Sequence, residues 1–215
     1  MPPSLISLLV VIAAYLLGSV SFALIASRLF GLADPRTYGS KNPGATNVLR
    51  SGHRGAAIVT LLGDVCKGWL AVFLAKHYAT DWGASALTVG LVAVAVFLGH
   101  LFPIFLKFKG GKGVATAAGV LLAIDPWLGL ATLATWLLIA LTLRYSSLAA
   151  LAAAVAAPIY ALLLSLDPVM VFTVGVIAVA LIGKHRANLQ RLITGNEPKI
   201  GARKKPPPSP APPVQ

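Results

Sequence analysis

The amino-acid sequence predicts an all-α integral membrane protein with about seven transmembrane helices. The chain of 215 residues is 57% hydrophobic and only 11% charged, and its mean hydropathy is +0.82. Apolar runs of membrane-spanning length, roughly 20 residues, alternate with short charged segments. A transmembrane β-barrel would alternate polar and apolar residues one by one, and no such alternation is visible in the sequence. We therefore expect a bundle of helices in lipid.

Each long apolar run is taken as one expected helix. The first run is not preceded by basic residues, unlike a secretory signal peptide, so we expect it to be retained as a span. In chain order the runs are Ser4 to Arg28, Ala56 to Ala75, Ala84 to Phe105, Val114 to Ile124, Trp127 to Leu143, Leu148 to Leu166 and Val169 to Gly183.

The fourth and fifth runs are the least regular part of this pattern. Val114 to Ile124 is only about half as long as a full crossing requires. Asp125 and Pro126 favour a turn between the two runs. The pair therefore forms either two short spans or a re-entrant hairpin, and both return Arg144 to the face where the pair began. A single kinked span is excluded, because it would leave Arg144 on the opposite face with Asp125 at mid-membrane.

The positive charges lie almost entirely on one side of the predicted bundle. All but two of the 18 lysines and arginines fall in loops on that side, the exceptions being Lys67 inside a run and Lys76 on the other side. Asp81, Asp125 and Asp167 mark the opposite side. Since basic loops remain in the cytoplasm, we expect the N-terminus outside and the C-terminus in the cytoplasm. The net charge of +12 thus follows from topology, and no nucleic-acid partner is expected.

We expect the chain to consist of one large domain and a short tail. Residues 1–198 form a single membrane-embedded domain. Residues 199–215 are basic and then rich in proline, so we expect a disordered tail that is dispensable for chemistry. Its cations at Arg203, Lys204 and Lys205 are expected to contact anionic lipid headgroups.

Three polar clusters fall on the predicted cytoplasmic face. The anion loop, Gly39 to Arg50, has the sequence GSKNPGATNVLR. Glycines and Pro43 interrupt helix periodicity here, which leaves backbone N–H groups free to bind an anion. The glycine segment, Lys107 to Thr116, places Lys112 among three glycines just before a helix, and this arrangement favours a phosphate or a carboxylate. It is not a Walker A loop, because Gly113 stands where serine or threonine is needed.

The third cluster, Lys184 to Glu197, has Lys184, Asn188 and Arg191 on one helical stripe beside His185. His185 can bind phosphate or transfer a proton. Within the runs, Asp64 and Lys67 are expected to pair across one helical turn.

His100 lies close to the glycine segment and is expected to orient it rather than to act directly. The four histidines are widely spaced and Cys66 stands alone, so no metal site is expected. A serine nucleophile at Ser40 is conceivable, but no His or Asp lies near it in the sequence.

Two other classes of protein are compatible with parts of this pattern. A transporter or flippase for a phosphorylated solute would also gather cations between helices, but its site would lie near mid-membrane rather than at one boundary. A purely structural membrane protein would not account for three polar clusters on one face.

The three clusters resemble the signature regions of the bacterial acyl-phosphate-dependent glycerol-3-phosphate acyltransferases, the PlsY family. The segments that carry the resemblance are GSKNPGATNVLR, GHLFPIFLKFKGGKGVAT and KHRANLQRLITGNEPK, with further likeness in GDVCKG and RYSSLAAL. Only the proline-rich tail departs from the family pattern. The His-x4-Asp motif of soluble-type glycerolipid acyltransferases is absent, which favours an acyl-phosphate donor.

The resemblance implies transfer of a fatty acyl group from acyl phosphate to the sn-1 hydroxyl of glycerol 3-phosphate at the bacterial inner membrane. No cofactor is implied, because acyl phosphate is already activated and the protein need only supply position and charge. The expected catalytic residues are Ser40, Arg50, Lys112, His185 and Asn188. The expected substrate-binding residues are Asn42, Gly44, Ala45, Thr46, Asn47, Lys109, Gly110, Gly111, Gly113 and Glu197.

Overall fold

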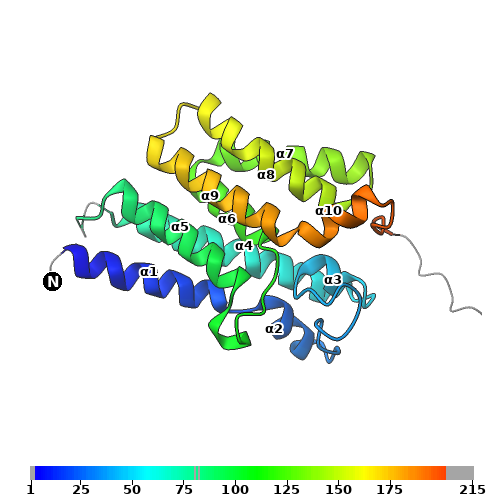
Figure 1. The fold of residues 1–215 in the computed structure, drawn as a ribbon. Coiled ribbons are helices and arrows are strands. Elements are labelled where there is room, and N and C mark those ends of the chain that lie inside the picture. Colours follow the sequence, from blue (N-terminus) through cyan, green and yellow to red (C-terminus); the bar gives the residue numbers. More distant parts are fainter. Residues whose placement is uncertain (1–2, 80, 82, 202–215) are drawn as a thin grey trace, which may run out of the picture.

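The structure, a computed structural model, describes residues 3–79, 81 and 83–201, and every regular element within them is helical. The predicted all-α class is therefore confirmed. The helices lie side by side in one bundle, with α3 and α10 toward the same end (Figure 1). In chain order they are α1 (Pro3–Ser19), α2 (Phe22–Leu29), α3 (Ala45–Leu49), α4 (Arg54–His77), α5 (Ala86–Leu101), the 3₁₀ turn η1 (Ile104–Leu106), α6 (Val114–Ile124), α7 (Pro126–Thr142), α8 (Ser146–Leu163), α9 (Pro168–Lys184) and α10 (Arg186–Ile193).

Helix length and hydropathy distinguish three kinds of segment among the described residues. Three helices are long and apolar enough to cross a membrane alone: α4, α8, and α5 with its extension through η1. Two bent pairs, α1 with α2 at 41° and α9 with α10 at 60°, raise the number of candidate spans to five. The remaining apolar helices, α6 and α7, are shorter. Each predicted run thus contains a helix, but not every run is a full-length span.

The first predicted span is a broken one. The chain leaves helical geometry between α1 and α2, at Val20 and Ser21, so the single helix expected from Ser4 to Arg28 is wrong in this detail. The carbonyl of Val20 accepts a hydrogen bond from Lys67 Nζ at 2.7 Å. Because a free carbonyl is costly in an apolar environment, Lys67 stabilises the break. No proline marks the position in the sequence.

The short helix α6 runs along only part of α4. A Cβ atom built on Gly68 would lie 2.4 Å from the carbonyl oxygen of Thr116, so the first turn of α6 lies beside the middle of α4. At the other end, Lys76 Nζ donates to the carbonyl oxygens of Ala123 and Ile124 at 3.0 and 2.7 Å. The C-terminus of α6 therefore reaches the end of α4 and is capped there by a cation.

The turn at Asp125 separates α6 from α7, as the sequence predicts. The side chain of Asp125 accepts a hydrogen bond from the backbone N–H of Leu128 at 2.9 Å, and Pro126 occupies the first turn of α7. This N-cap starts a new helix that packs both on α6 and on α8. The single kinked span excluded above is indeed absent.

Close helix contacts in the bundle depend on glycine. A Cβ on Gly18 of α1 would lie 2.1 Å from the carbonyl oxygen of Val96, and one on Gly99 of α5 would lie 2.3 Å from that of Tyr15. The buried core around these contacts consists largely of alanine and valine. Small residues let two backbones approach closely, which is how helices associate in lipid.

The structure describes the first residues of the predicted tail, 199–201. The backbone N–H of Ile200 donates to the carbonyl of Arg144 at 2.6 Å, and Arg144 Nη2 donates to the carbonyl of Ile200 at 2.9 Å. The chain is thus held against the start of α8 beyond the predicted boundary at residue 198. The rest of the tail, including Arg203, Lys204 and Lys205, lies outside the described residues.

Substituting Gly119 with alanine tests the crossing of α4 and α6. Its Cβ would lie 2.0 Å from the carbonyl oxygen of Val65, a backbone atom that cannot move away alone. We expect the Gly119→Ala variant to lose about 1–3 kcal/mol of stability, seen as a lower midpoint of thermal unfolding in detergent. Gly175→Ala is the matched control, since nothing lies within 4 Å of a Cβ there. Equal midpoints for the two variants would contradict this packing.

Candidate active site

The second and third polar clusters meet through a chain of hydrogen bonds. Lys112 Nζ donates to Asn188 Oδ1, and Asn188 Nδ2 donates to Glu197 Oε1 at 2.6 Å. Glu197 also accepts from Ser147 Oγ at 2.6 Å and from Arg191 Nε at 2.7 Å. Residues far apart in the sequence, from the glycine segment, the start of α8 and the region of α10, therefore form one network.

Glu197 holds this network in place rather than offering a free base. Its side chain is only 6% exposed. Burial works to raise its pKa, but the hydrogen bonds from Ser147, Asn188 and Arg191 outweigh burial and hold the pKa of the carboxyl below its usual range. The ionised carboxylate fixes the Asn188 amide with its NH₂ group toward Glu197. The amide oxygen of Asn188 is thereby directed at Lys112.

Lys112 is a partly desolvated cation. Burial lowers the pKa of its ammonium group to about 8; Glu197 opposes this shift, while the nearby cations Arg191 and Arg50 reinforce it. The effect of Arg50 also brings the anion loop into the electrostatic reach of Lys112. Because one of its three N–H bonds points to Asn188, the ammonium has two left for an anion.

His185 lies beside this network at the junction of α9 and α10. It is 2% exposed, and its Nδ1 is 2.9 Å from the carbonyl oxygen of Leu181. A carbonyl only accepts, so Nδ1 carries the hydrogen, and Nε2 of the neutral ring is an acceptor. The ring orientation is thus fixed, with Nε2 as its acceptor nitrogen.

The anion loop is organised by the amide of Asn47. Its Nδ2 donates to the carbonyls of Pro35 and Tyr38 at 2.7 and 3.2 Å, and its Oδ1 accepts from the backbone N–H of Ser40 at 2.9 Å. Asn47 is 1% exposed, so its side chain is used within the loop. The loop also contains the short helix α3, so its backbone is less free than its glycines and Pro43 predict.

The other expected residues of the loop lie around this amide. Ser40, Thr46 and Arg50 are exposed, and Asn42, Gly44 and Ala45 are half-buried. Within the part of the chain that the structure describes, Ser40 is hydrogen-bonded only through its backbone. No triad of nucleophile, base and orienting group therefore forms around its hydroxyl.

The glycine segment packs tightly against α5. A Cβ on Gly110 would lie 2.2 Å from the carbonyl oxygen of His100, and one on Gly111 would lie 2.1 Å from His100 Nε2. Gly113 has a φ of +81° and its Cβ would lie 2.4 Å from the ring of Phe97. Lys109 is exposed on the outer side of the segment.

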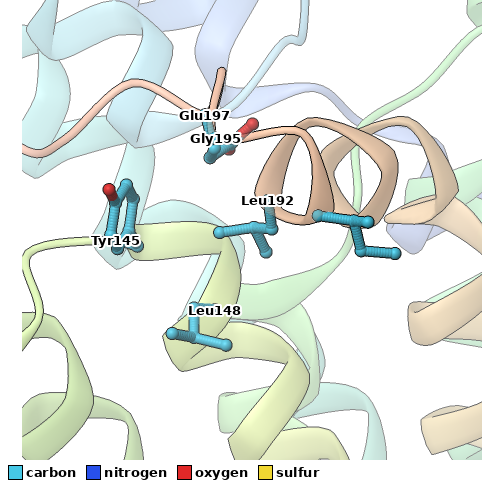
Figure 2. Close-up of a pocket in the computed structure, with 6 residues that line it drawn as sticks. Tyr145, Leu148, Leu192, Gly195 and Glu197 are labelled. Atoms are coloured by element: carbon cyan, nitrogen blue, oxygen red, sulfur yellow. The ribbon is translucent and has the colours of Figure 1, made fainter.

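Sequence reasoning assigned no role to Ser147 or to a neighbouring pocket. Ser147 lies in the segment RYSSLAAL, whose pattern was noticed but suggests no chemistry alone. The pocket has a volume of about 380 Å³ and a largely apolar lining from the start of α8 and the end of α10 (Figure 2). Its lining residues are Tyr145, Leu148, Leu192, Ile193, Gly195 and Glu197. The carboxylate of the network therefore borders an apolar space.

Metal ligands do not gather in the described residues. No group of three or more His, Cys, Asp or Glu side chains there is close enough to hold an ion. The expected pair of Asp64 and Lys67 is confirmed, with Lys67 Nζ 2.8 Å from Asp64 Oδ1.

Comparison with known proteins shows similarity along most of the chain. Residues 8–195 match the family described as glycerol-3-phosphate acyltransferase. A glycerol-3-phosphate acyltransferase of Dechloromonas aromatica is 63% identical over 194 residues, which cover 90% of this chain and 96% of that protein. One of Ralstonia nicotianae is 62% identical, covering 91% of this chain and 94% of that protein.

Two crystal structures have the same fold. They are structures of PlsY (YgiH), an integral membrane glycerol 3-phosphate acyltransferase, in a glycerol 3-phosphate form and a lysophosphatidic acid form. The first is 37% identical with a TM-score of 0.84, covering 91% of this chain and 96% of that chain. The second is 36% identical with a TM-score of 0.83, covering 91% of this chain and 95% of that chain.

Replacing Glu197 with glutamine tests the network through stability. Glutamine has one acceptor oxygen, so at least one of the three donors loses its partner, at a cost of about 1–2 kcal/mol. We expect a lower midpoint of thermal unfolding near pH 7 for Glu197→Gln, while Asn196→Ala, next in the chain and exposed, stays close to wild type.

The stabilities of wild type and Glu197→Gln should become equal at low pH. The folded pKa of Glu197 is held below its ordinary value of 4.5, so its stabilisation is present above that pH and is lost as pH falls through the lowered value. The difference between wild type and Glu197→Gln should therefore disappear at low pH. A difference that grows toward acid would contradict the ionised carboxylate.

Anion binding should depend on the ionisation of Lys112. With a pKa of about 8, the ammonium loses its proton as pH rises through that value. We expect the affinity for inorganic phosphate, measured by calorimetry from pH 7.5 to 9.5, to fall across this range. Lys112→Arg should keep its charge and flatten the profile, because guanidinium stays protonated. An unchanged slope in Lys112→Arg would assign the pH dependence to another group.

Proposed function

The chain belongs to the glycerol-3-phosphate acyltransferase family, and we propose that it transfers a fatty acyl group from acyl phosphate to the sn-1 hydroxyl of glycerol 3-phosphate. The products are lysophosphatidic acid and inorganic phosphate. The related crystal structures were obtained in glycerol 3-phosphate and lysophosphatidic acid forms, which are the acceptor and the product of this reaction. The acyl-phosphate donor is our own assignment.

The observation that carries the proposal is the Lys112–Asn188–Glu197 network beside His185. Two hydrogen atoms of the Lys112 ammonium remain for a phosphate oxygen, and Arg50 is near enough to add a second positive charge. A partly buried cation interacts with phosphate more strongly than an exposed one, because water screens the attraction less. The site is thus suited to two substrates that both carry phosphate.

The reaction needs no covalent intermediate. The acceptor hydroxyl oxygen attacks the acyl carbon, a new ester C–O bond forms, and the bond from that carbon to the phosphate oxygen breaks. The hydroxyl proton passes to the leaving phosphate or to Nε2 of His185, which is an acceptor in the neutral ring. Because acyl phosphate is an activated anhydride, holding both substrates and stabilising negative charge accounts for catalysis.

Residue roles follow from this arrangement. We assign acceptor binding to Ser40, Arg50, Lys112, His185 and Asn188. We assign the phosphate cradle to Ala45, Thr46, Asn47, Gly110, Gly111 and Gly113, with Asn42, Gly44, Lys109 and Glu197 bordering the site. Within the cradle, Asn47 acts by shaping the loop, since its amide bonds to Pro35, Tyr38 and Ser40.

The fatty chain and the membrane fit the same end of the bundle. The apolar pocket beside Glu197 offers about 380 Å³ for the part of the chain nearest the carbonyl (Figure 2). The clusters of basic residues support an active site on the cytoplasmic side of the bacterial inner membrane, with the N-terminus outside.

The donor is tested with purified protein in detergent. Mixed with glycerol 3-phosphate and palmitoyl phosphate, the protein should release inorganic phosphate and form lysophosphatidic acid in equal amounts, whereas palmitoyl-coenzyme A should give neither. Activity with the coenzyme A thioester alone would overturn the donor assignment. Arg50→Ala should raise the Michaelis constant for glycerol 3-phosphate by about tenfold, while Arg54→Ala, exposed at the start of α4, should not.

The covalent alternative is tested in the same reaction. Incubation with radiolabelled palmitoyl phosphate without acceptor, followed by acid quench, should leave no label on the protein. Label retained by wild type and lost in Ser40→Ala would replace direct transfer by an acyl-enzyme route.

A further inference from the structure

A second polar network, fully buried, lies beneath the glycine segment and is separate from the Lys112 network. Asp64 Oδ1 lies 2.8 Å from Lys67 Nζ and 3.5 Å from His100 Nδ1, and Thr116 Oγ1 lies 3.1 Å from the same His100 nitrogen. Asp64 and Lys67 are each 2% exposed, His100 is 8% exposed and Thr116 is 0% exposed. Burying this many polar groups is expensive, so the network needs a reason beyond packing.

His100 contacts the glycine segment on two sides. Its carbonyl oxygen accepts a hydrogen bond from the backbone N–H of Gly111 at 3.1 Å, so this N–H already has a partner. Its Nε2 occupies the space where a Cβ on Gly111 would lie, at 2.1 Å. Its Nδ1 lies 3.1 Å from Oγ1 of Thr116, the last residue of the segment, which is in the first turn of α6. The residue therefore fixes both the segment and the helix that follows.

Backbone conformation does not explain why residues 110 and 111 are glycine. Gly113 has a positive φ, which favours glycine, but Gly110 and Gly111 do not. The close approach of His100 supplies the missing reason at both positions. The histidine and the two glycines form one fitted contact.

The rest of the network ties this contact to the anion loop. Lys67 pairs with Asp64 and also donates to the carbonyl of Val20 at the break between α1 and α2. A small cavity of about 10 Å³ is lined by Lys67, His100, Gly110 and Gly111 together with Pro43 of the anion loop. The anion loop and the glycine segment thus meet beside the buried network.

We propose that His100 is a positioning residue. Its ring fixes the position of the Gly110–Gly113 backbone, and with it the position of Lys112, relative to the anion loop. Asp64 and Lys67 hold the ring in place. His100 acts through its contacts with the glycines and with Thr116. The inference rests on the proposed function only for its kinetic readout, because phosphate binding reports on the same loop without turnover.

The test is a double-mutant cycle between His100→Asn and Gly111→Ala. Asparagine keeps a polar atom in the place of Nδ1, so the bond to Thr116 and the fold should be retained, as judged by the thermal midpoint in detergent. Removing the Nε2 edge should weaken inorganic phosphate binding and raise the Michaelis constant for glycerol 3-phosphate about tenfold, with a smaller change in kcat. His77→Asn, at the far end of α4, is the matched control and should change neither.

Gly111→Ala separates positioning from a merely structural role. In wild type its methyl group meets Nε2 and should be strongly disruptive, whereas in His100→Asn the space is open and the same methyl should cost less or restore binding. Effects that multiply independently, or a His100→Asn protein with wild-type phosphate affinity, would overturn the proposal. Should His100→Asn fail to fold, Thr116→Val removes the hydroxyl that holds the ring and should itself weaken phosphate binding. Wild-type phosphate affinity in Thr116→Val would then overturn the proposal.

The two proposals fail in different ways. If wild type binds phosphate but transfers no acyl group from any donor, the proposed function is lost, and the calorimetric cycle still decides the role of His100. If transfer occurs but the cycle shows no coupling, only the positioning role is lost.

Discussion

The candidate site depends on the side-chain amide of Asn188, which bridges Lys112 and Glu197. An amide has distinct donor and acceptor ends, and here the acceptor end faces Lys112 while the donor end faces Glu197. The carboxylate fixes that orientation because it only accepts when ionised. The Lys112 ammonium and the Glu197 carboxylate are thus held in one partly buried network without pairing directly with each other, which leaves the ammonium able to bind another anion. A direct pair would neutralise Lys112 instead.

Close backbone packing makes this arrangement possible. The glycine contacts between α1 and α5, and between α4 and α6, bring helices near enough for side chains from distant segments to meet. In the same packing α6 starts beside the middle of α4, and Gly111 and Gly113 of the preceding glycine segment are buried while Lys112 is half-buried. Lys112 therefore lies where burial lowers its pKa, although it belongs to a polar, basic segment.

The sequence predicted the helical class, the turn at Asp125 and the meeting of the glycine segment with the region of α10, because hydropathy and charge patterning act over long runs. It did not predict the break at Val20 or the capping of α6 by Lys76. Each depends on a lysine side chain, Lys67 at the break and Lys76 at the cap, that reaches backbone carbonyls distant in the sequence, a contact with no local signal. Ser147 was missed for the same reason, since a serine at the start of a helix is ordinary until Glu197 lies beside it.

The glycines of the glycine segment have causes in the structure that differ from the one that the sequence suggests. Three glycines around a lysine suggest backbone N–H groups arranged around phosphate, yet the N–H of Gly111 bonds to His100 and Gly113 adopts a left-handed conformation that starts α6. Two of the glycines are needed because His100 comes so close, and the third because of its φ angle. The N–H of Gly111 is therefore not free for an anion, and the charge that the segment presents is the ammonium of Lys112. The glycines act by holding that single charge at a fixed depth, opposite Asn188 and within reach of Arg50.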